Sequence, residues 1–379
     1  MKTKRTKIAV LSLADINNYG DMFFPYLFRE ELKKRLPDAE IRLYTNVACH
    51  SVLYDTQKYD RELLGDYDAI ILAGGETIHL WDEERWSNLY PDAGDGNISD
   101  IAFDWLTLDR PFKAYFSVGV HPNMQGHRQE ALCAMNRLNY LSVRGELSKK
   151  ILEGAIISHS NEIRIVPDLG WIFNQYIDRW EQEGKGKTAL PQTPYMIFEM
   201  FYEFDENTLQ FAAGALARFQ EATAVRVVLL PIVQTKSTQA LSSWNDYYPL
   251  SRLQEYAEGA FLLMPDQLDI FDLGRLLKHA KFYLGGSMHG AVTCLAYGKP
   301  AGNVLTWTAP KLQDVHGMRM RADCFITHWG RLPKLLDALN AEAEDEKAAR
   351  YAAKYADYMR YRLSVEIELL CRQLTGNDK

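Results

Sequence analysis

Short apolar runs alternate with amphipathic stretches along most of this chain, and this alternation limits its fold more than any other feature does. Apolar runs of about four to eight residues are typical of buried strands, and a period of about 3.6 residues is typical of helices. The apolar runs of the first half are residues 8–13, 40–44, 68–73, 112–118, 141–143 and 163–166. The helical patterns between them cover residues 22–36, 98–109, 125–138 and 145–153. This order predicts a parallel sheet whose strands are joined by crossover helices.

A second series of strands and helices begins after a polar segment near residue 185, which is followed by Pro191 and Pro194. Such a composition is typical of a linker. The predicted strands of the second series are residues 195–200, 225–232, 261–264, 282–285 and 301–305. Its predicted helices are residues 206–222, 250–258, 268–280, 288–297 and 331–340. The chain is therefore expected to be an α/β protein with two Rossmann-like domains, residues 1–185 and 186–340, that face one cleft.

The remaining segment, residues 341–379, has acidic residues in its first turns and an apolar stripe at helical spacing. These features predict one long C-terminal helix over residues 342–372. We expect this helix to pack back on the two domains, although a stripe of this kind also forms ordinary core contacts.

Composition and charge exclude several classes of protein. The chain is 47% hydrophobic and 25% charged, as expected of a globular protein, and its net charge of −7 disfavours nucleic-acid binding. It contains neither an apolar run long enough to span a bilayer nor a signal-peptide pattern at its basic start. Its five cysteines lack C-x-x-C spacing, which predicts free thiols in the cytoplasm and neither a disulfide nor a zinc site. Peripheral membrane contact and the oligomeric state stay open.

Residues 282–300 carry the strongest indication of a functional site. They are predicted to form a buried strand, a glycine turn and a helix, with Ser287 and His289 where the helix begins. A helix N-terminus offers unpaired N–H groups and roughly half a positive charge, which favours an anionic ligand. A histidine in that place can carry a proton to or from the ligand. In the alternative interpretation, Ser287 is only an N-cap and His289 is structural.

Other polar residues follow predicted strands of the first domain, where ligands bind in open α/β sheets. Asn18 and Asp21 can hydrogen-bond sugar hydroxyls, although they can equally cap a helix. Gly75 and Glu76 precede a loop that is rich in aromatic side chains: His79, Trp81, Trp86 and Tyr90. Aromatic faces beside carboxylates suit a carbohydrate, but they also occur at protein interfaces.

Cationic side chains that could bind an anionic ligand are also found near strand ends. Arg144 ends a predicted strand and can form two hydrogen bonds with a carboxylate or a phosphate. Its alternative role is an ion pair with Asp168 or Glu146. Three further cations follow the strand predicted for residues 301–305: Lys311, Arg319 and Arg321. At least one of them is expected to be a solvated surface residue.

The combined order of these motifs resembles the polysaccharide pyruvyl transferase family over nearly the whole chain. The motifs are N-x-G-D at residues 18–21, the strand ending in Gly-Gly at 68–75, S-V-R-x-x-x-S at 142–148, P-D at 167–168, S-x-H-G at 287–290 and G-x-P at 298–300. The resemblance implies two Rossmann-like domains in a GT-B-like arrangement. It also implies transfer of a pyruvyl group from phosphoenolpyruvate to a sugar of a cell-surface polysaccharide or its precursor, which gives a pyruvate ketal.

On this resemblance we expect His289 and Glu76 to be catalytic. The residues expected to bind the donor are Arg144, Ser287, Gly290, Lys311 and Arg321. The residues expected to bind a carbohydrate acceptor, free or lipid-linked, are Asn18, Asp21, Gly75, His79 and Trp81. We expect no cofactor besides phosphoenolpyruvate as donor substrate, and no metal.

The chain departs from the family pattern at two positions. Ser287 occupies a place where many members carry an arginine, and Glu76 replaces a third glycine. Two other functions therefore stay open: a GT-B glycosyltransferase that uses a nucleotide sugar, and a non-catalytic glycan-binding protein. Release of phosphate from phosphoenolpyruvate would indicate pyruvyl transfer, and release of a nucleoside diphosphate would indicate a glycosyltransferase. Release of neither product would indicate a glycan-binding protein.

Overall fold

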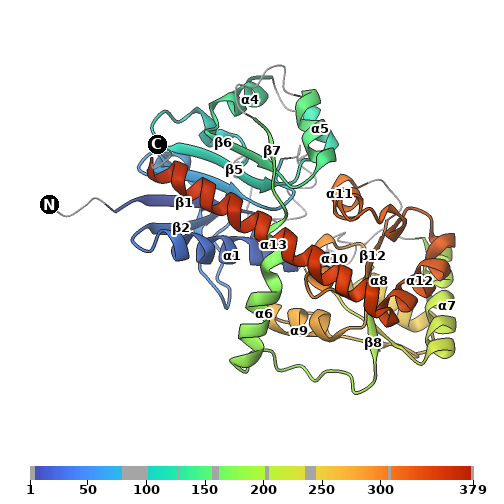
Figure 1. The fold of residues 1–379 in the computed structure, drawn as a ribbon. Coiled ribbons are helices and arrows are strands. Elements are labelled where there is room, and N and C mark those ends of the chain that lie inside the picture. The colour runs from blue at the N-terminus through green and yellow to red at the C-terminus, as the bar shows by residue number, and fades with distance from the viewer. Residues whose placement is uncertain are drawn as a thin grey trace. The chain divides into compact units, whose positions relative to one another are not determined.

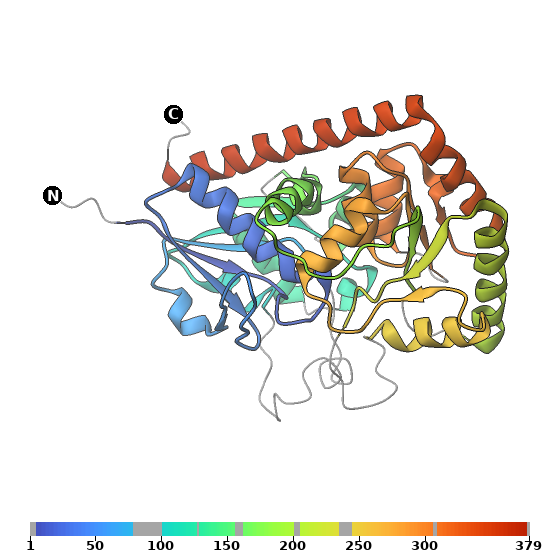
Figure 2. The same cartoon turned by 90° about the horizontal axis from the view of Figure 1, so that it is seen from below.

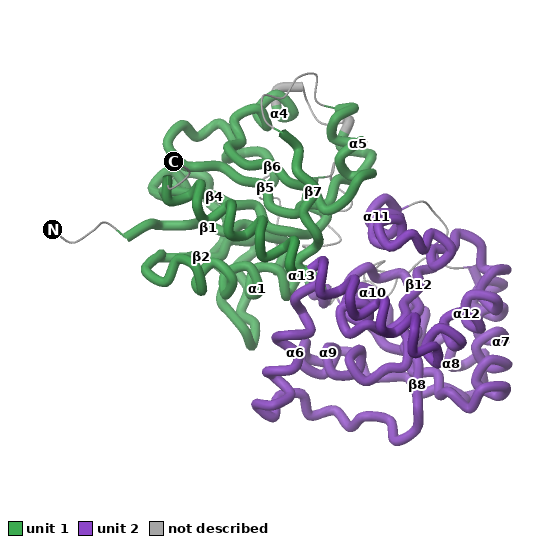
Figure 3. The backbone as a smooth tube through the Cα atoms, in the orientation of Figure 1, with its two compact units in different colours: residues 1–16, 20–169, 360–379 green, residues 17–19, 170–359 purple. Residues whose placement is uncertain are grey.

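The computed structural model describes most of the chain: residues 5–78, 101–126, 129–155, 162–200, 205–234, 245–305 and 309–376. The chain forms two compact units, shown in different colours in Figure 3. The first unit comprises residues 1–16, 20–169 and 360–379, and the second comprises residues 17–19 and 170–359.

The first unit is built on a parallel sheet of seven strands in the order β3-β2-β1-β4-β5-β6-β7 (Figure 1). The strands are β1 (Lys7–Leu11), β2 (Glu40–Thr45), β3 (Gln57–Lys58), β4 (Ala69–Ala73), β5 (Phe112–Val118), β6 (Tyr140–Val143) and β7 (Arg164–Ile165). Every residue of β4 is buried, as expected of an apolar strand in a sheet that is covered on both faces. The six strands predicted for the first half are confirmed, whereas β3 is short and exposed and has no apolar pattern.

The helices of the first unit lie at the predicted positions except at residues 98–109. Besides the end of the C-terminal helix, the helices in its described residues are α1 (Tyr19–Arg35), α2 (Arg61–Leu64), α4 (Gln129–Ala134) and α5 (Glu146–Ala155), with 3₁₀ turns η1 (Asp104–Thr107), η2 (Pro122–Gly126) and η3 (Met135–Arg137). The helix predicted for residues 98–109 is wrong over its described part, which contains only η1. The fully buried Trp105 donates its indole N–H to the carbonyl of Ile101 at 2.9 Å, and the extended backbone of Leu108 ends the turn.

The second unit is built on a parallel sheet of six strands in the order β10-β9-β8-β11-β12-β13. The strands are β8 (Tyr195–Phe198), β9 (Arg226–Leu229), β10 (Leu262–Leu263), β11 (Tyr283–Gly285), β12 (Ala301–Val304) and β13 (Phe325–Ile326). The helices are α6 (Phe173–Gln182), α7 (Glu206–Thr223), α8 (Tyr247–Tyr256), α9 (Ile270–His279), α10 (Met288–Ala296), α11 (Pro310–Met318) and α12 (Leu332–Glu344), with short turns η4 (Leu169–Ile172), η5 (Ala322–Cys324) and η6 (Trp329–Arg331). The five predicted strands and five predicted helices of this half are confirmed, with bounds that differ by a few residues.

Both sheets share the strand order of a Rossmann-like fold. In the first sheet β1 lies between β2 and β4, and in the second sheet β8 lies between β9 and β11. The chain reverses its direction across the sheet at β1 and at β8. In open α/β sheets, ligands bind outside the carboxyl ends of the strands at such a switch point.

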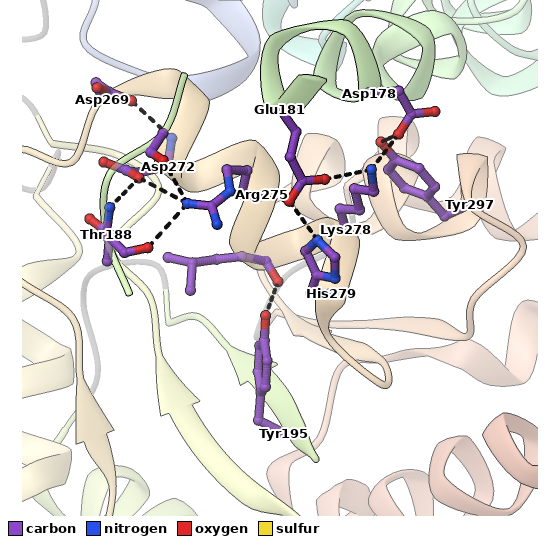
Figure 4. A network of polar contacts seen from close by, with 12 residues as sticks. Asp178, Glu181, Thr188, Tyr195, Asp269, Asp272, Arg275, Lys278, His279 and Tyr297 are labelled. Atoms are coloured by element: carbon purple, nitrogen blue, oxygen red, sulfur yellow. Dashed lines mark hydrogen bonds and ion pairs between the residues drawn. The ribbon is translucent and has the colours of Figure 1, made fainter. Parts of the chain in front are cut away.

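The second unit begins before the boundary predicted near residue 185. Figure 4 shows the polar network that attaches α6 and the following segment to α9. Glu181 of α6 accepts hydrogen bonds from Lys278 at 2.6 Å and from His279 at 2.9 Å. Arg275 donates to the carbonyls of Gly186 at 2.7 Å and Thr188 at 3.2 Å. The predicted linker is therefore fixed to the second unit, and the division between the units lies near residue 170.

The predicted long C-terminal helix is confirmed as α13 (Glu346–Thr375), which begins later than predicted because α12 continues to Glu344. The carboxylate of Asp345 accepts hydrogen bonds from the backbone N–H groups of Lys347 and Ala348, which starts a new helix. Figure 1 and Figure 2 show α13 as the longest helix. Its residues up to 359 belong to the second unit and its later residues to the first. None of the helices in the described ranges combines the length and apolarity needed to cross a membrane.

Candidate functional site

The carboxyl edge of the first sheet brings together loops that follow β4, β5, β6 and β7. Gly74 and Gly75 adopt φ angles of 63° and 70°, which favour glycine, and a side chain at Gly74 would collide with the ring of Phe24. The N–H of Gly119, after β5, donates to the carbonyl of Gly75 at 2.7 Å. The N–H of Ile78 donates to the carbonyl of Gly119 at 3.2 Å. The Gly-Gly turn is thereby held against the loop that follows β5.

Arg144 follows β6 and is the central cation of this edge. Its side chain is only 3% exposed, and its Nη1 lies 3.4 Å from Oδ2 of Asp168 while Nη2 lies 3.9 Å from Oε1 of Glu76. Within the described ranges, Nε and Nη2 of Arg144 have no hydrogen-bond acceptor. A Cβ atom at Gly119 would collide with the guanidinium, so this glycine makes room for it. The arrangement leaves a buried cation with donors that remain to be satisfied, as in anion sites.

Ser117 holds the loops of this edge in an unusual backbone conformation. Its φ of 53° lies in the left-handed region and accompanies a register shift between β5 and β6. The hydroxyl donates to the carbonyls of Val166 and Pro167 at 3.2 and 3.0 Å. Its N–H donates to Oγ of Ser142 at 2.9 Å. Ser117 therefore fixes the Pro-Asp turn that carries Asp168. Strain of this kind is concentrated at functional sites.

The carboxyl edge of the second sheet places Ser287 at the N-cap of α10, as predicted. Its Oγ accepts a hydrogen bond from the N–H of Gly290 at 3.3 Å. His289 is 7% exposed, and its ring lies 6.3 Å from that of Phe173. A Cβ atom at Gly290 would lie 2.5 Å from the ring of Tyr283, so this glycine is required for packing. The hydroxyl of Ser287 and the N–H of Gly290 are therefore hydrogen-bonded to each other, and this bond would have to break before either group could bind a ligand.

A buried carboxyl group that sequence analysis missed lies beside this N-cap. Glu199 follows β8, and its Oε2 accepts hydrogen bonds from the N–H of Ser287 at 2.7 Å and the hydroxyl of Tyr283 at 2.8 Å. Glu199 and Asp246 are both completely buried. Burial raises the pKa of each carboxyl group, and the interaction between the two adds to the effect for Asp246. The available signal was the acidic residue that directly follows an apolar strand, in Tyr195–Phe198 and then Glu199.

A second buried pair holds the other side of the same turn. Nδ2 of Asn303 donates to the carbonyls of Gly285 at 2.7 Å and Ser287 at 3.1 Å. Its Oδ1 lies 2.8 Å from Nε2 of His316, which must therefore carry the hydrogen. Burial, with Arg319 and Arg321 nearby, lowers the pKa of His316 to about 3. His316 is accordingly neutral and structural at neutral pH.

The cations that were expected near His289 have partners of their own. Nη1 of Arg321 lies 2.7 Å from Glu342, and its Nε lies 3.1 Å from Asp323. Arg319 is buried, with Nη2 3.8 Å from the same Glu342. Lys311 lies in the first turn of α11 and is partly exposed. Of the three, Arg321 is thus held by two carboxylates within the second unit.

Of the residues expected to bind the acceptor, the described part of the chain contains Asn18, Asp21 and Gly75. Asn18 pairs with Val233 in an antiparallel bridge, so its segment belongs to the second unit. Asp21 belongs to the first unit, where a Cβ atom at Gly75 would lie 3.7 Å from its Oδ1. The aromatic residues of the predicted loop lie outside the described residues: His79, Trp81, Trp86 and Tyr90. Among the residues that are described, no group of three or more His, Cys, Asp or Glu side chains is placed to hold a metal ion.

Solved structures of low sequence identity share the fold of this chain. A UDP-GlcNAc 2-epimerase from Neisseria meningitidis bound to UDP-GlcNAc has a TM-score of 0.55 and 9% identity, over 94% of this chain and 99% of that chain. The corresponding epimerase from Methanocaldococcus jannaschii, in complex with UDP-GlcNAc and UDP, has a TM-score of 0.53 and 10% identity, over 93% and 99%. A trehalose-6-phosphate synthase has a TM-score of 0.56 and 10% identity, over 98% and 99%. The fold is thus the two-domain α/β fold of the GT-B class.

Comparison by sequence gives a narrower result. No curated protein matches the chain. The family model described as polysaccharide pyruvyl transferase matches residues 18–307, which is well over half of the chain and includes the Gly-Gly turn, Arg144 and the start of α10.

Proposed function

The chain belongs to the polysaccharide pyruvyl transferase family, and from this we propose that it transfers the pyruvyl group of phosphoenolpyruvate to a sugar as a ketal. In this reaction two hydroxyl oxygens of the sugar form bonds to C2 of the donor. The C2–O bond to phosphate breaks, C3 gains a proton to become a methyl group, and inorganic phosphate leaves with the other hydroxyl proton. The acceptor is a sugar of a cell-surface polysaccharide or of its precursor.

The observation that carries the proposal is the buried guanidinium of Arg144. Its Nε and Nη2 have no acceptor in the described part of the chain, and the guanidinium packs so closely on Gly119 that a Cβ atom there would collide with it. The two donors on one edge of a guanidinium match the two oxygens of a carboxylate. We assign Arg144 to the carboxylate of phosphoenolpyruvate, with Asp168 orienting the guanidinium from 3.4 Å.

Acid–base chemistry in this scheme is assigned to two residues, His289 and Glu76. His289, in the first turn of α10, delivers the proton to C3 of the donor. Glu76, in the turn after the Gly-Gly pair, accepts a proton from a sugar hydroxyl. Its Oε1 lies 3.9 Å from Nη2 of Arg144.

The donor phosphate needs positive charge that Ser287 does not provide. The N–H groups of Ser287 and Gly290 already donate to Glu199 and to Oγ of Ser287. We therefore assign the phosphate to the positive end of α10 and to Lys311, whose helix follows the adjacent strand β12. In this assignment, these groups take the place of the charge-assisted hydrogen bond that an arginine at position 287 would make.

A comparison of donors tests the proposal. The protein is incubated with a panel of free and lipid-linked sugars, and either phosphoenolpyruvate or nucleotide sugars, with and without EDTA. We expect phosphate release from phosphoenolpyruvate that is unaffected by EDTA. Release of a nucleoside diphosphate, especially if it requires Mg²⁺ or Mn²⁺, would instead indicate a glycosyltransferase, and release of neither product a glycan-binding protein.

Donor binding can be measured without knowing the acceptor. A ligand that binds only the folded protein raises its melting temperature, so phosphoenolpyruvate should stabilise the wild type. The shift should be lost in Arg144→Lys, which keeps the charge but not the two-pronged geometry. The matched control is Arg137→Ala, because Arg137 is half-exposed and donates to the carbonyl of Thr107 in the same unit. An equal shift in Arg144→Lys and in the wild type would contradict the role of Arg144.

A further inference from the structure

The carboxyl pair Glu199–Asp246 lies at the switch point of the second sheet. Glu199 directly follows β8, and it accepts a hydrogen bond from the N–H of Ser287. Ser287 follows β11, which is the neighbour of β8 on the other side of the switch point. Both acidic residues have 0% exposure. A buried ionised carboxylate is costly unless a cation or several hydrogen bonds stabilise it, so two such groups side by side require an explanation.

The oxygen atoms of the pair divide into two kinds. Oε2 of Glu199 accepts from Ser287 and Tyr283, and Oδ2 of Asp246 accepts from the N–H groups of Ile232 at 3.0 Å and Val233 at 2.7 Å. The other oxygen of each group, Oε1 and Oδ1, is buried and has no N–H or O–H donor in the described part of the chain. The two carboxyl groups interact with each other, and a hydrogen bond between them would satisfy both of these oxygens. A hydrogen bond between two carboxyl groups exists only if one of them carries a proton.

The surroundings of the pair favour retention of that proton. The groups that face it are the hydroxyl of Tyr283 on β11, the backbone N–H groups of residues 286–287 and those of residues 232–233. No lysine, arginine or histidine of the described ranges forms an ion pair with either acid. Burial therefore raises the pKa of both groups, and ionisation of one raises that of the other.

We propose that Glu199 and Asp246 share one proton and act together as positioning residues for the turn of residues 286–289, which carries His289. Glu199 holds this turn by the N–H of Ser287, while Asn303 holds it from the other side by the carbonyls of Gly285 and Ser287. A Cβ atom at Gly285 would lie 2.6 Å from Oε2 of Glu199, so the carboxyl group fits closely. The positioning role rests on the proposed function of His289, but the shared proton does not.

Infrared difference spectroscopy of the intact protein at pH 7 tests the shared proton. The wild type should show the C=O stretch of a protonated carboxyl group. The band should shift or disappear in Glu199→Gln and also in Asp246→Asn, because each variant removes one of the two groups that share the proton. Tyr283→Phe is the control and should keep the band. Absence of the band from the wild type, or its persistence at the same frequency in both isosteric variants, would overturn the proposal.

The pH dependence of unfolding tests the same proton by another route. An acid that stays protonated in the folded state, while the unfolded chain has released its proton, makes stability fall as pH rises. This term raises the unfolding equilibrium constant of the wild type by about tenfold per pH unit between the unfolded and folded pKa values. Glu199→Gln should lose it, whereas the exposed control Asp337→Asn should keep the wild-type slope. Equal slopes in wild type and Glu199→Gln would contradict the shared proton.

Hydrogen exchange tests the positioning role without use of the reaction. Loss of a hydrogen bond to a charged acceptor should speed exchange of the Ser287 N–H by roughly ten- to a hundredfold in Glu199→Ala. Glu199→Gln keeps an acceptor oxygen and should restore slow exchange. The change should be confined to peptides that cover residues 283–290. If exchange there is unchanged in Glu199→Ala, Glu199 does not position the turn; if phosphoenolpyruvate chemistry alone fails, only the proposed function is lost.

Discussion

The two sheets share a Rossmann-like strand order, but the ionisable side chains buried at their carboxyl edges are of opposite kinds. In the first unit the buried charge is a cation, Arg144, whose Nε and Nη2 find no acceptor among the described residues. In the second unit the buried groups are the acids Glu199 and Asp246, and Glu199 accepts the N–H of Ser287, the N-cap residue of α10. The same topology therefore builds one edge that is ready for an anion and another that is already supplied with one.

This difference shows why a helix N-terminus alone does not define an anion site. The sequence of residues 282–300 predicts an N-terminus with unpaired N–H groups, and α10 begins where it was expected. The groups that a ligand would use are nevertheless partly occupied, by Oγ of Ser287 and by a carboxyl group 88 residues earlier in the chain. What remains for catalysis at this edge is His289, and for donor binding the first edge becomes more important.

The largest effect is expected from His289→Ala. If His289 transfers the proton, its removal should lower kcat by about 10²–10⁴-fold with little change in melting temperature. If it is only a packing partner of Phe173, the melting temperature should fall and activity should follow the folded fraction. Steady-state kinetics and thermal unfolding of the same preparation separate the two, with the exposed His328→Ala as control. A stable His289→Ala protein with near-native kcat would remove the second edge from the mechanism.

A smaller effect, on donor binding, is expected from the first edge. Arg144→Ala should raise the KM for phosphoenolpyruvate by roughly 10²-fold, since charge-assisted hydrogen bonds contribute about 1.5–3 kcal/mol each. Gly119→Ala should act in the same direction because its methyl group would displace the guanidinium. Both KM and kcat are measured against each substrate in turn. A change confined to the acceptor KM would show that Arg144 serves the sugar and not the donor.

The secondary structure was largely predictable, whereas the partners of the functional side chains were not. Apolar runs identify strands that are buried on both faces, so β4 and β5 appear in the sequence, while the two-residue edge strand β3 does not. Arg144, Ser287 and His289 could be placed at strand ends from local pattern alone. Gly119 and Glu199 were missed because their roles depend on contacts with Arg144 and Ser287, which are distant in sequence. Local pattern thus finds the groups that do chemistry, but not those that fill the space or the hydrogen bonds around them.

A modest effect on stability is expected from Ser287→Ala. Loss of an N-cap side chain costs about 1 kcal/mol, which should lower the melting temperature by roughly 2–4 °C. Because Oγ of Ser287 serves the N–H of Gly290, the donor KM should change far less than in Arg144→Ala. Thermal unfolding and donor titration are measured together. A tenfold rise in donor KM at unchanged stability would mean that Ser287 touches the donor, and the two edges would then differ less than their hydrogen bonds indicate.

The smallest effect concerns Glu181, an acid of the second unit whose surroundings are the reverse of those of Glu199. Burial opposes its ionisation, but hydrogen bonds from Lys278, His279 and Arg275 outweigh this and lower the pKa of Glu181 to about 2. A carboxyl group with a lowered pKa stabilises the fold above its unfolded value, and the contribution is lost as pH falls through the folded value. Glu181→Gln should therefore reduce stability at pH 7 by less than about 1 kcal/mol, because solvent screens a partly exposed network. The deficit should shrink from about pH 4.5 downward, while Glu199→Gln should gain on the wild type as pH rises. Denaturant unfolding of both variants between pH 3 and pH 9 measures the two slopes, and slopes of the same sign would mean that one of these acids has been assigned the wrong protonation state.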